Sequence, residues 1–305
     1  MTVDRAMPLK VGVRLTHAAV QAIADEAGVD VLHIKGPAVH PSLLATVEEE
    51  GPDGETVVVP RDRGSIDADV LVRPRHVVRL LDAMRRHDWT LKVDFPDGSS
   101  FEHAATMGHP RLVHVDVHRS FPGFGPDPEA VFDHLWRDRQ QHEIAGQPCV
   151  VPDPTAQRLI LILNAVRGGP SRRSEIARLW DGAADEDRAT VVRLAEETGA
   201  EVALAAASGR LAQYTSRREH DLWELLASGR TAPVAMWRAR VRAQPTTRAA
   251  AREAVKRIIP NPHRLALRLG HTPTRRELAD AWIDQGKAGC RALRDAVRSR
   301  TGGKR

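Results

Sequence analysis

The chain of 305 residues contains only two cysteines, Cys149 and Cys290, and neither belongs to a Cys-x-x-Cys pair. Two cysteines so far apart form neither a disulfide framework nor a structural zinc site, and they are typical of free thiols in a reducing compartment. Aromatic residues make up only 4% of the chain. Few rings are therefore present on which the bases of a single-stranded nucleic acid could stack.

Long apolar runs are also absent. No stretch approaches the roughly 18 apolar residues of a membrane span, and the first residues lack the basic start and apolar run of a signal peptide. We therefore expect a cytoplasmic protein. The hydrophobic fraction of 42% and the charged fraction of 28% are those of a globular protein, and the length suits one large or two modest domains.

Charge is unevenly distributed along the chain. The formal net charge is +5, but residues 235–305 contain 18 Lys and Arg against 5 Asp and Glu. The rest of the chain is therefore acidic overall. Two interpretations of this basic C-terminal region stay open: it binds an anionic partner such as nucleic acid, or it forms a solvated, arginine-rich helical face.

The first half of the chain mixes helix and strand patterns. Apolar residues with helical spacing predict two helices, and β-branched or alternating runs predict three strands. The predicted helices cover residues 15–27 and 77–84, and the predicted strands cover residues 29–34, 64–72 and 112–118.

After Pro152 the patterns become helical throughout, so we place a domain boundary near residues 145–155. The predicted helices are 156–166, 175–180, 188–198, 201–214 and 220–226. We predict an α/β (α+β) fold in which residues 1–150 form a domain with a small mixed sheet. Residues 151–305 would form an all-helical domain.

Three shorter segments complete the prediction for the first half. The Lys35-Gly36 turn follows a strand, and residues 38–44 after it have a helical pattern. Residues 48–63 contain a Gly-Pro-Asp-Gly sequence followed by valines, which predicts an inserted loop or hairpin arm. Residues 94–110 are interpreted as rich in turns.

Asp67 and Asp69 are the first candidates for chemistry. Residues two apart on a strand face the same side, so both carboxylates should project from one face of a largely apolar strand. Adjacent carboxylates repel each other unless a cation neutralises them, and hard oxygen ligands suit Mg²⁺ or Mn²⁺. The pair therefore indicates a metal site, although such pairs are also common at ordinary strand edges and in loops.

Asp116 lies in another apolar strand and would join the pair if the two strands are neighbours. Three carboxylates can hold two metal ions, of which one activates the attacking oxygen and the other stabilises the leaving oxygen. The alternative is that Asp116 simply faces solvent from a half-buried strand.

The Lys35-Gly36 turn between a strand and an expected helix start is a candidate phosphate site. Glycine permits a close approach of the backbone to a ligand, and the amides of a helix N-terminus favour phosphate. Lys35 would add positive charge. A lysine in a surface turn without any function is the alternative interpretation.

These features in this order resemble the DNA polymerase beta-like nucleotidyltransferase superfamily, and in particular its uncharacterised bacterial branch. The resemblance covers roughly residues 15–215. It is carried by the sequences LHIKGPAV, GSIDADVLV, HAATMGH and LVHVDVHRSF, and continues in weaker form through VFDHLWRDR and PDPTAQRLILILNAV.

The resemblance implies a Mg²⁺- or Mn²⁺-dependent enzyme that transfers a nucleoside monophosphate from a nucleoside triphosphate (NTP) to a hydroxyl or similar acceptor and releases pyrophosphate. It leaves the acceptor open between a small molecule, a protein and RNA. It implies these roles: Asp67 and Asp69 are the metal-binding pair, Asp116 is the third catalytic carboxylate, and Lys35, Gly36, Ser65 and His118 belong to the nucleotide site.

The sequence also departs from that branch. A Lys-Gly pair replaces the usual Gly-Ser helix start, residues 48–63 are an insertion, and Asn164 stands where the branch often has histidine. His103 resembles a histidine that is usual between the strands.

Two other function classes stay open at this stage. His114, Asp116 and His118 alternate along one strand face, and two imidazoles with a carboxylate could bind zinc or iron in a metallohydrolase or an oxygenase. Alternatively, a catalytically inactive chain of this fold would use its basic C-terminal region to hold nucleic acid or an anionic partner.

Overall fold

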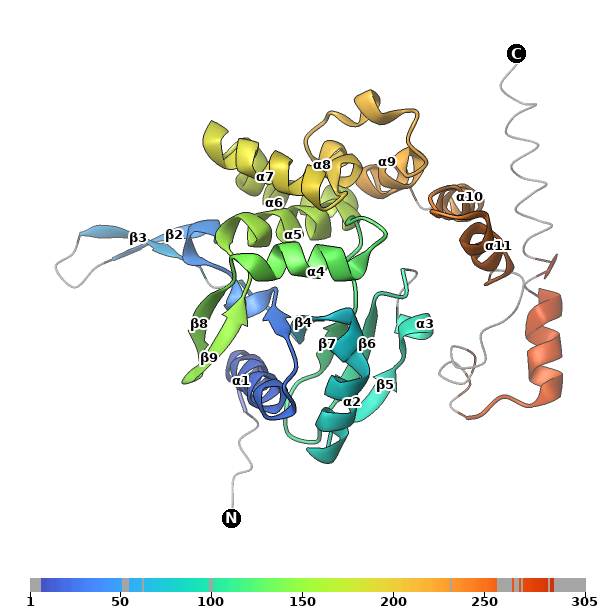
Figure 1. Ribbon diagram of the computed structural model, residues 1–305, viewed down its shortest axis with the longest axis horizontal. Coiled ribbons are helices and arrows are strands. Elements are labelled where there is room, and N and C mark those ends of the chain that lie inside the picture. Colours follow the sequence, from blue (N-terminus) through green and yellow to red (C-terminus); the bar gives the residue numbers. More distant parts are fainter. Residues whose placement is uncertain are drawn as a thin grey trace.

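The computed structural model describes residues 7–50, 55–61, 63–98, 101–230, 232–256, 265, 269, 271–284 and 286–287. Within this part of the chain, a five-stranded sheet is covered by two helices on one face and by a group of helices on the other (Figure 1). The predicted α+β class with a small mixed sheet is confirmed.

The sheet combines parallel and antiparallel neighbours in the order β1-β4-β7-β6-β5. The central strands β4 and β7 are parallel, and the other three pairs are antiparallel. The strands are β1 (Val31–His33), β4 (Ala68–Val72), β5 (Thr90–Val93), β6 (Ala104–Gly108) and β7 (Val115–His118).

The alternation of side chains along the strands separates two hydrophobic cores. Val70 and Val117 belong to the core that packs under α1 (Leu9–Ala27) and α2 (Val77–Arg86). Leu71, one residue further along β4, belongs to the other core, together with apolar residues of the helices on the opposite face. Because successive side chains point to opposite faces, Asp69 points to the same face as Leu71, toward those helices.

The helices on this second face share the core with the sheet. α5 is apolar nearly all round, and most of its side chains are fully buried, as expected for a helix enclosed by others. The helices and turns are α4 (Pro128–Arg137), α5 (Pro154–Arg167), η4 (Gly169–Arg172), α6 (Arg173–Ile176), a π-helical turn η5 (Ala177–Asp181), α7 (Asp185–Glu197), α8 (Glu201–Ala207), η6 (Leu211–Tyr214), α9 (His220–Ser228), α10 (Pro233–Arg242) and α11 (Thr247–Lys256).

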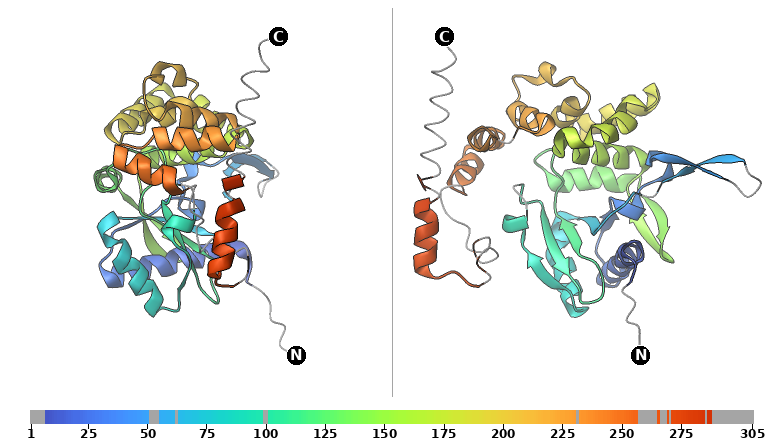
Figure 2. Two further views of the ribbon diagram at one scale, coloured as in Figure 1. Left: turned by 90° about the vertical axis from the view of Figure 1, so that its right-hand side faces the viewer. Right: turned by 180° about the vertical axis from the view of Figure 1, so that it is seen from behind.

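Two hairpins complete the described fold. The predicted arm within residues 48–63 is a hairpin of β2 (Thr46–Glu50) and β3 (Thr56–Pro60) that projects from the body, at the opposite end from α10 and α11 (Figures 1 and 2). The second hairpin joins β8 (Gln140–Ile144) and β9 (Gln147–Val151), and the sequence patterns did not predict it.

The predicted helix over residues 38–44 is wrong. The chain instead makes two short 3₁₀ turns, η1 (Gly36–Ala38) and η2 (Pro41–Leu43), separated by extended backbone. Pro41 explains the difference, because a residue that precedes proline is disfavoured in the α-helical region. The Lys35-Gly36 turn therefore does not stand at the N-terminus of an α-helix.

The interpretation of residues 94–110 as rich in turns is also wrong. The segment contains the short helix α3 (Phe95–Gly98) and, above all, β6, which lies between β7 and β5 in the sheet. The sequence of β6 is Ala-Ala-Thr-Met-Gly, which has little intrinsic preference for strand. Its burial between two neighbouring strands overrides that weak local preference.

The described strands all end by Val151, and helices follow from Pro154 onward. The hydrophobic core on the second face joins residues from before and after this point. None of the helices in the described part of the chain combines the length and apolar character that a membrane crossing requires. Most of the basic C-terminal region beyond residue 256 lies outside the described residues.

Candidate functional site

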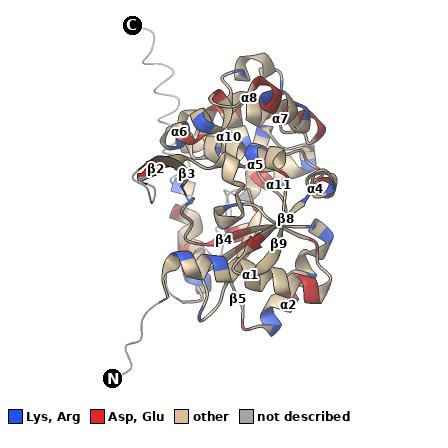
Figure 3. Ribbon diagram, turned by 90° about the vertical axis from the view of Figure 1, so that its left-hand side faces the viewer, with Lys and Arg blue, Asp and Glu red and all other residues tan. Residues whose placement is uncertain are grey.

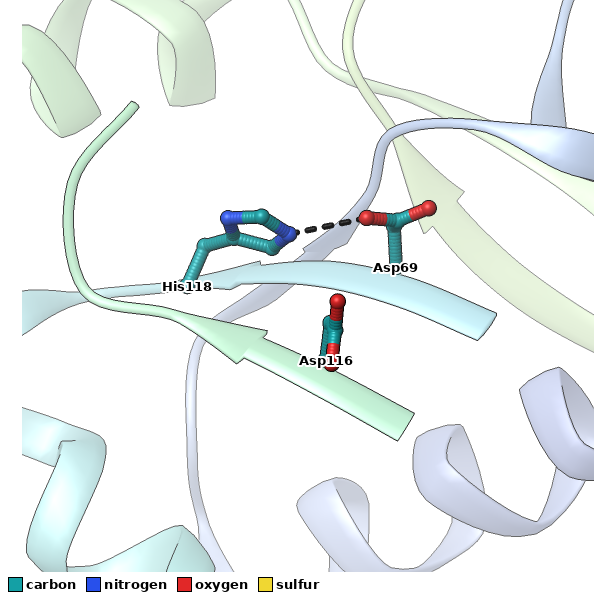
Figure 4. Close-up of side chains that lie close together, drawn as sticks. All are labelled: Asp69, Asp116 and His118. Carbon is teal, nitrogen blue, oxygen red and sulfur yellow. Dashed lines mark hydrogen bonds and ion pairs between the residues drawn. The ribbon is translucent and has the colours of Figure 1, made fainter. Parts of the chain in front are cut away.

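The register of the two central strands brings Asp69 and Asp116 side by side. Asp69 of β4 and Asp116 of β7 are direct partners across the parallel ladder, and both point to the face covered by the helices. His118, two residues beyond Asp116, points to the same face. Ligand atoms of Asp69, Asp116 and His118 all lie within 4.8 Å of one another (Figure 4).

Asp69 is held by two cationic or polar partners. Its Oδ1 atom accepts a hydrogen bond from the Lys35 ammonium at 2.5 Å, and it lies 2.8 Å from Nε2 of His118 (Figure 4). Burial by itself would raise the pKa of this carboxyl group, but Lys35 and His118 outweigh burial and hold it well below its ordinary range. Asp69 is therefore a permanent anion at neutral pH.

His118 and His103 form a buried imidazole pair behind Asp69. Their ring centroids are 5.1 Å apart. Burial lowers the pKa of both imidazoles, and for His103 burial together with the neighbouring His118 lowers it to about 2. Both rings are therefore neutral at pH 7, so Lys35 supplies the positive charge beside Asp69.

Asp116 is more open than Asp69. It is partly exposed, and its Oδ1 accepts a hydrogen bond of 2.7 Å from the Thr106 hydroxyl in the neighbouring strand β6. No hydrogen bond to Oδ2 is formed by the described residues, which leaves this oxygen open to a ligand. The sequence patterns did not identify Thr106, because the strand that carries it was not predicted.

Asp67 stands one residue before β4 rather than within it. The Ser65 hydroxyl donates to the backbone carbonyl of Asp67 at 2.7 Å and lies 3.1 Å from its Oδ1, which shapes the turn into the strand. Burial, followed by repulsion from Asp69 and Asp116, raises the pKa of Asp67. Asp67 thus lies close enough to interact with both carboxylates, although it is not in the compact group around His118.

The backbone of the Lys35-Gly36 turn lies close to Ser65. Gly36 has a φ of +59°, and a Cβ atom placed there would lie 3.2 Å from the Ser65 Cβ. Glycine adopts this backbone conformation without the strain that other residues meet. The turn therefore packs directly against Ser65 and aims Lys35 at Asp69, a role that requires no α-helix.

His114 does not join the group that the alternative metal site required. It lies just before β7 and is exposed, whereas the clustered ligand atoms among the described residues come from Asp69, Asp116 and His118. Asp69 is therefore the third member of the group, in place of the His114 that the alternative metal site required. The resulting set has two carboxylates and one imidazole, which is harder than the set expected for zinc.

A cavity of about 940 Å³ opens over these groups. One wall is formed by the strand and turn residues, and the opposite wall comes from the residues that flank the β2–β3 hairpin and from the region of α5 and α6. Its described lining includes Lys35, Ser65, Asp67, Asp69 and Asp116 together with Arg61, Arg63, Asn164, Arg172, Glu175 and Arg178.

The opposite wall carries an arginine group that the sequence interpretation missed. Arg63 contacts Glu175 at 3.1 Å, and Arg172 lies 3.7 Å from the same carboxylate. Arg178 donates to the carbonyl of Leu43, and its pKa is lowered by burial and by Arg63. Glu175 thus pairs with two guanidinium groups while Arg178 bonds a carbonyl, so this wall has an excess of positive charge.

The sequence contains part of the information needed to find this arginine group. Arg172, Glu175 and Arg178 are three residues apart, which places them on one side of a helical segment. What the spacing does not reveal is that Arg63, more than a hundred residues earlier, comes to the same carboxylate.

The profile of a family described as uncharacterised nucleotidyltransferase matches residues 59–215. That span begins in β3 and includes Asp67, Asp69 and Asp116. No curated protein matches the chain.

Two solved structures resemble the chain at low sequence identity. The antibiotic-resistance factor ANT(2'')-Ia, solved in solution, is 12% identical over 70% of this chain and 98% of its own, with a TM-score of 0.35. An antigenic nucleotidyltransferase-like protein from Paracoccidioides brasiliensis is 16% identical over 71% of this chain and 93% of its own, with a TM-score of 0.35.

Proposed function

The chain belongs to the uncharacterised nucleotidyltransferase family, and on this premise we propose that it transfers a nucleoside monophosphate from an NTP to a hydroxyl group, with the help of Mg²⁺ or Mn²⁺. The observation that carries the proposal is the pairing of Asp69 with Asp116 across two parallel strands. Their shared cavity has carboxylates on one wall and arginines on the other.

The residues present fit a divalent cation. Asp69 and Asp116 offer hard oxygen atoms within a few ångströms of each other, and Asp67 adds a third carboxylate at the same cavity. Like charges at this spacing repel unless a cation lies between them. Asp69, Asp116 and Asp67 would hold Mg²⁺ or Mn²⁺, which would neutralise charge on the phosphates and make the acceptor hydroxyl more acidic.

The walls of the cavity suit the triphosphate of the donor. Lys35 stands beside Asp69 and can donate to a phosphate oxygen, and the Gly36 backbone admits a ligand closely. Across the cavity, Arg63 and Arg172 share Glu175, and Arg178 lies on the same wall. Guanidinium groups pair well with phosphate, so we assign this wall to the β- and γ-phosphates.

The reaction would be a single displacement at the α-phosphorus. A new bond forms from the acceptor oxygen to the α-phosphorus, the bond from the α-phosphorus to the bridging oxygen breaks, and pyrophosphate leaves. We assign the released hydroxyl proton to Asp116, whose Oδ2 has no hydrogen-bond donor among the described residues. Positioning and charge neutralisation would supply most of the rate enhancement.

The direct test is transfer of label. The protein is incubated with each α-labelled NTP, Mg²⁺ and a cell extract, and any labelled species is separated and identified. The proposal expects transfer that depends on Mg²⁺ and is lost in Asp67→Ala and Asp116→Asn. Full activity of Asp67→Ala would refute the role of Asp67.

Metal analysis and binding separate this function from the other two classes. Tight zinc or iron without NTP binding would support a metallohydrolase instead. Salt-sensitive polynucleotide binding without any turnover would support an inactive binding protein. The proposal expects weak Mg²⁺ binding that is strengthened by NTP.

A further inference from the structure

A second cavity of about 590 Å³ adjoins the cavity over the carboxylates. It lies between the first turns of α1 and the two 3₁₀ turns that follow Gly36. Its walls are mostly apolar. The apolar side chains that line it are Leu9, Val13, Pro37, Val39, Pro41, Leu44 and Pro60.

The two cavities are contiguous. Leu9, Leu44, Arg63, Gly64 and Ser65 line both of them. Ser65 is the closest link to the chemistry, because its hydroxyl lies 3.1 Å from a carboxylate oxygen of Asp67. The second cavity therefore lies one residue, Ser65, away from a carboxylate of the first.

The charged residues of the second cavity are all of one sign. Lys10, Arg14, Arg63 and His142 line it, and none of its described lining residues is acidic. Arg63 contacts Glu175, and burial together with Arg14 lowers the pKa of His142, so that imidazole is neutral at pH 7. Lys10 and Arg14 belong to α1 and bring positive charge to this cavity. Figure 3 shows basic residues on α1.

We propose that this cavity binds the acceptor, and that the acceptor is a small molecule with an apolar body, an anionic group and a hydroxyl group. The proposal rests on the proposed nucleotidyl transfer. Cavities of this volume with apolar walls and few polar groups are typical small-molecule sites. The apolar walls would contact the apolar body, and the basic residues of α1 would pair with the anionic group. The hydroxyl group would lie beside Ser65, on the side nearest the carboxylates.

The charges of the two cavities argue against the opposite assignment. The triphosphate of the donor needs cations close to the carboxylates, and these are Lys35 and the arginines of the larger cavity. The smaller cavity has mostly apolar walls, and of its Lys and Arg residues only Arg63 also lines the larger cavity. A cationic acceptor would meet Lys10 and Arg14 without any carboxylate of the cavity's described lining to pair with.

Three hydroxyl compounds test the acceptor class one property at a time. The probe 12-hydroxydodecanoate has the apolar body and the negative charge. The compound 12-amino-1-dodecanol keeps the body but reverses the charge, and 4-hydroxybutyrate keeps the charge but shortens the body. Binding of each is measured by calorimetry on the full chain without NTP, below the concentration at which the probes form micelles.

We expect 12-hydroxydodecanoate to bind at least tenfold more tightly than either of the other two compounds. Arg14→Glu should weaken its binding at least tenfold, and Arg14→Lys should restore most of it. Arg86→Glu is the matched control, because Arg86 is exposed on α2 and does not line the cavity. Circular dichroism and thermal unfolding establish that the variants are folded.

The outcomes separate the two proposals. Equal binding of the three compounds, or equal losses in Arg14→Glu and Arg86→Glu, would overturn the acceptor class. Displacement of the probe by a non-hydrolysable NTP would also overturn it, because the cavity would then belong to the donor. If the probe binds as expected but no NTP transfers label to any acceptor, nucleotidyl transfer is wrong and the cavity remains a site for apolar anions.

Discussion

Replacement of Asp116 by asparagine should remove activity and leave the fold intact. The side chain is partly exposed and makes one hydrogen bond, from the Thr106 hydroxyl at 2.7 Å. The amide oxygen of asparagine can accept the same bond. We therefore expect the free energy of unfolding to change by less than about 1 kcal/mol, as for other substitutions outside the core.

Catalysis should respond far more strongly. Asparagine has the shape of aspartate but no negative charge, so it can neither hold a divalent cation well nor take a proton. Removal of one electrostatic contact to a transition state typically costs a factor of about 100 to 1,000, or roughly 3 to 4 kcal/mol. Initial rates of label transfer and thermal unfolding of Asp116→Asn measure the two effects separately.

Asp69→Asn provides the contrast. The Asp69 side chain is 7% exposed and pairs with Lys35, which is 13% exposed. Loss of the carboxylate leaves a mostly buried ammonium without its counter-ion, which typically destabilises by about 3 to 5 kcal/mol. Asp116→Asn with at least a tenth of wild-type activity, or with as large a loss of stability as Asp69→Asn, would refute this assignment of the two carboxylates.

Three further predictions follow from the same contacts. Without metal at pH 7, Asp67→Asn should raise the melting temperature, because the raised pKa of Asp67 means that its ionised form destabilises the fold. This gain in melting temperature should shrink as the pH falls through the raised pKa. It should disappear once the carboxyl is protonated in both the folded and the unfolded state. Gly36→Ala should destabilise by about 1 to 3 kcal/mol in denaturant titrations, and by more than Gly28→Ala, since both glycines have positive φ but only Gly36 has neighbours within 4 Å of an added Cβ. Burial raises the pKa of the Cys149 thiol to about 12, so peptide mapping should find it unmodified by iodoacetamide at pH 8 in the native protein and modified in urea; rapid native labelling would contradict its burial.

The local patterns of the sequence were sufficient to predict the direction in which the side chains of Asp69 and Asp116 point. The alternation of Asp69 with apolar neighbours, and the same alternation around Asp116, predicted side chains on one face of each strand, because a strand has a period of two whatever lies beside it. Local patterns also predicted the helices over residues 15–27 and 77–84. Gly28 ends the first of these helices with a φ of +61°.

Other features depended on contacts between distant segments. β6 has weak strand preference and exists because two neighbours pair with it. The ion pair of Arg63 with Glu175 joins two segments that lie more than a hundred residues apart in the chain.

The sequence by itself therefore determined which residues face the site from each strand, because side-chain direction along a strand is a property of the local backbone. Only the tertiary structure decided that β4 and β7 are neighbours in a register that pairs Asp69 with Asp116. It also decided that His118 rather than His114 joins them, that arginines line the same cavity as the carboxylates, and that an apolar cavity adjoins it. These choices follow from burial and pairing among segments far apart in the chain, which no local pattern encodes.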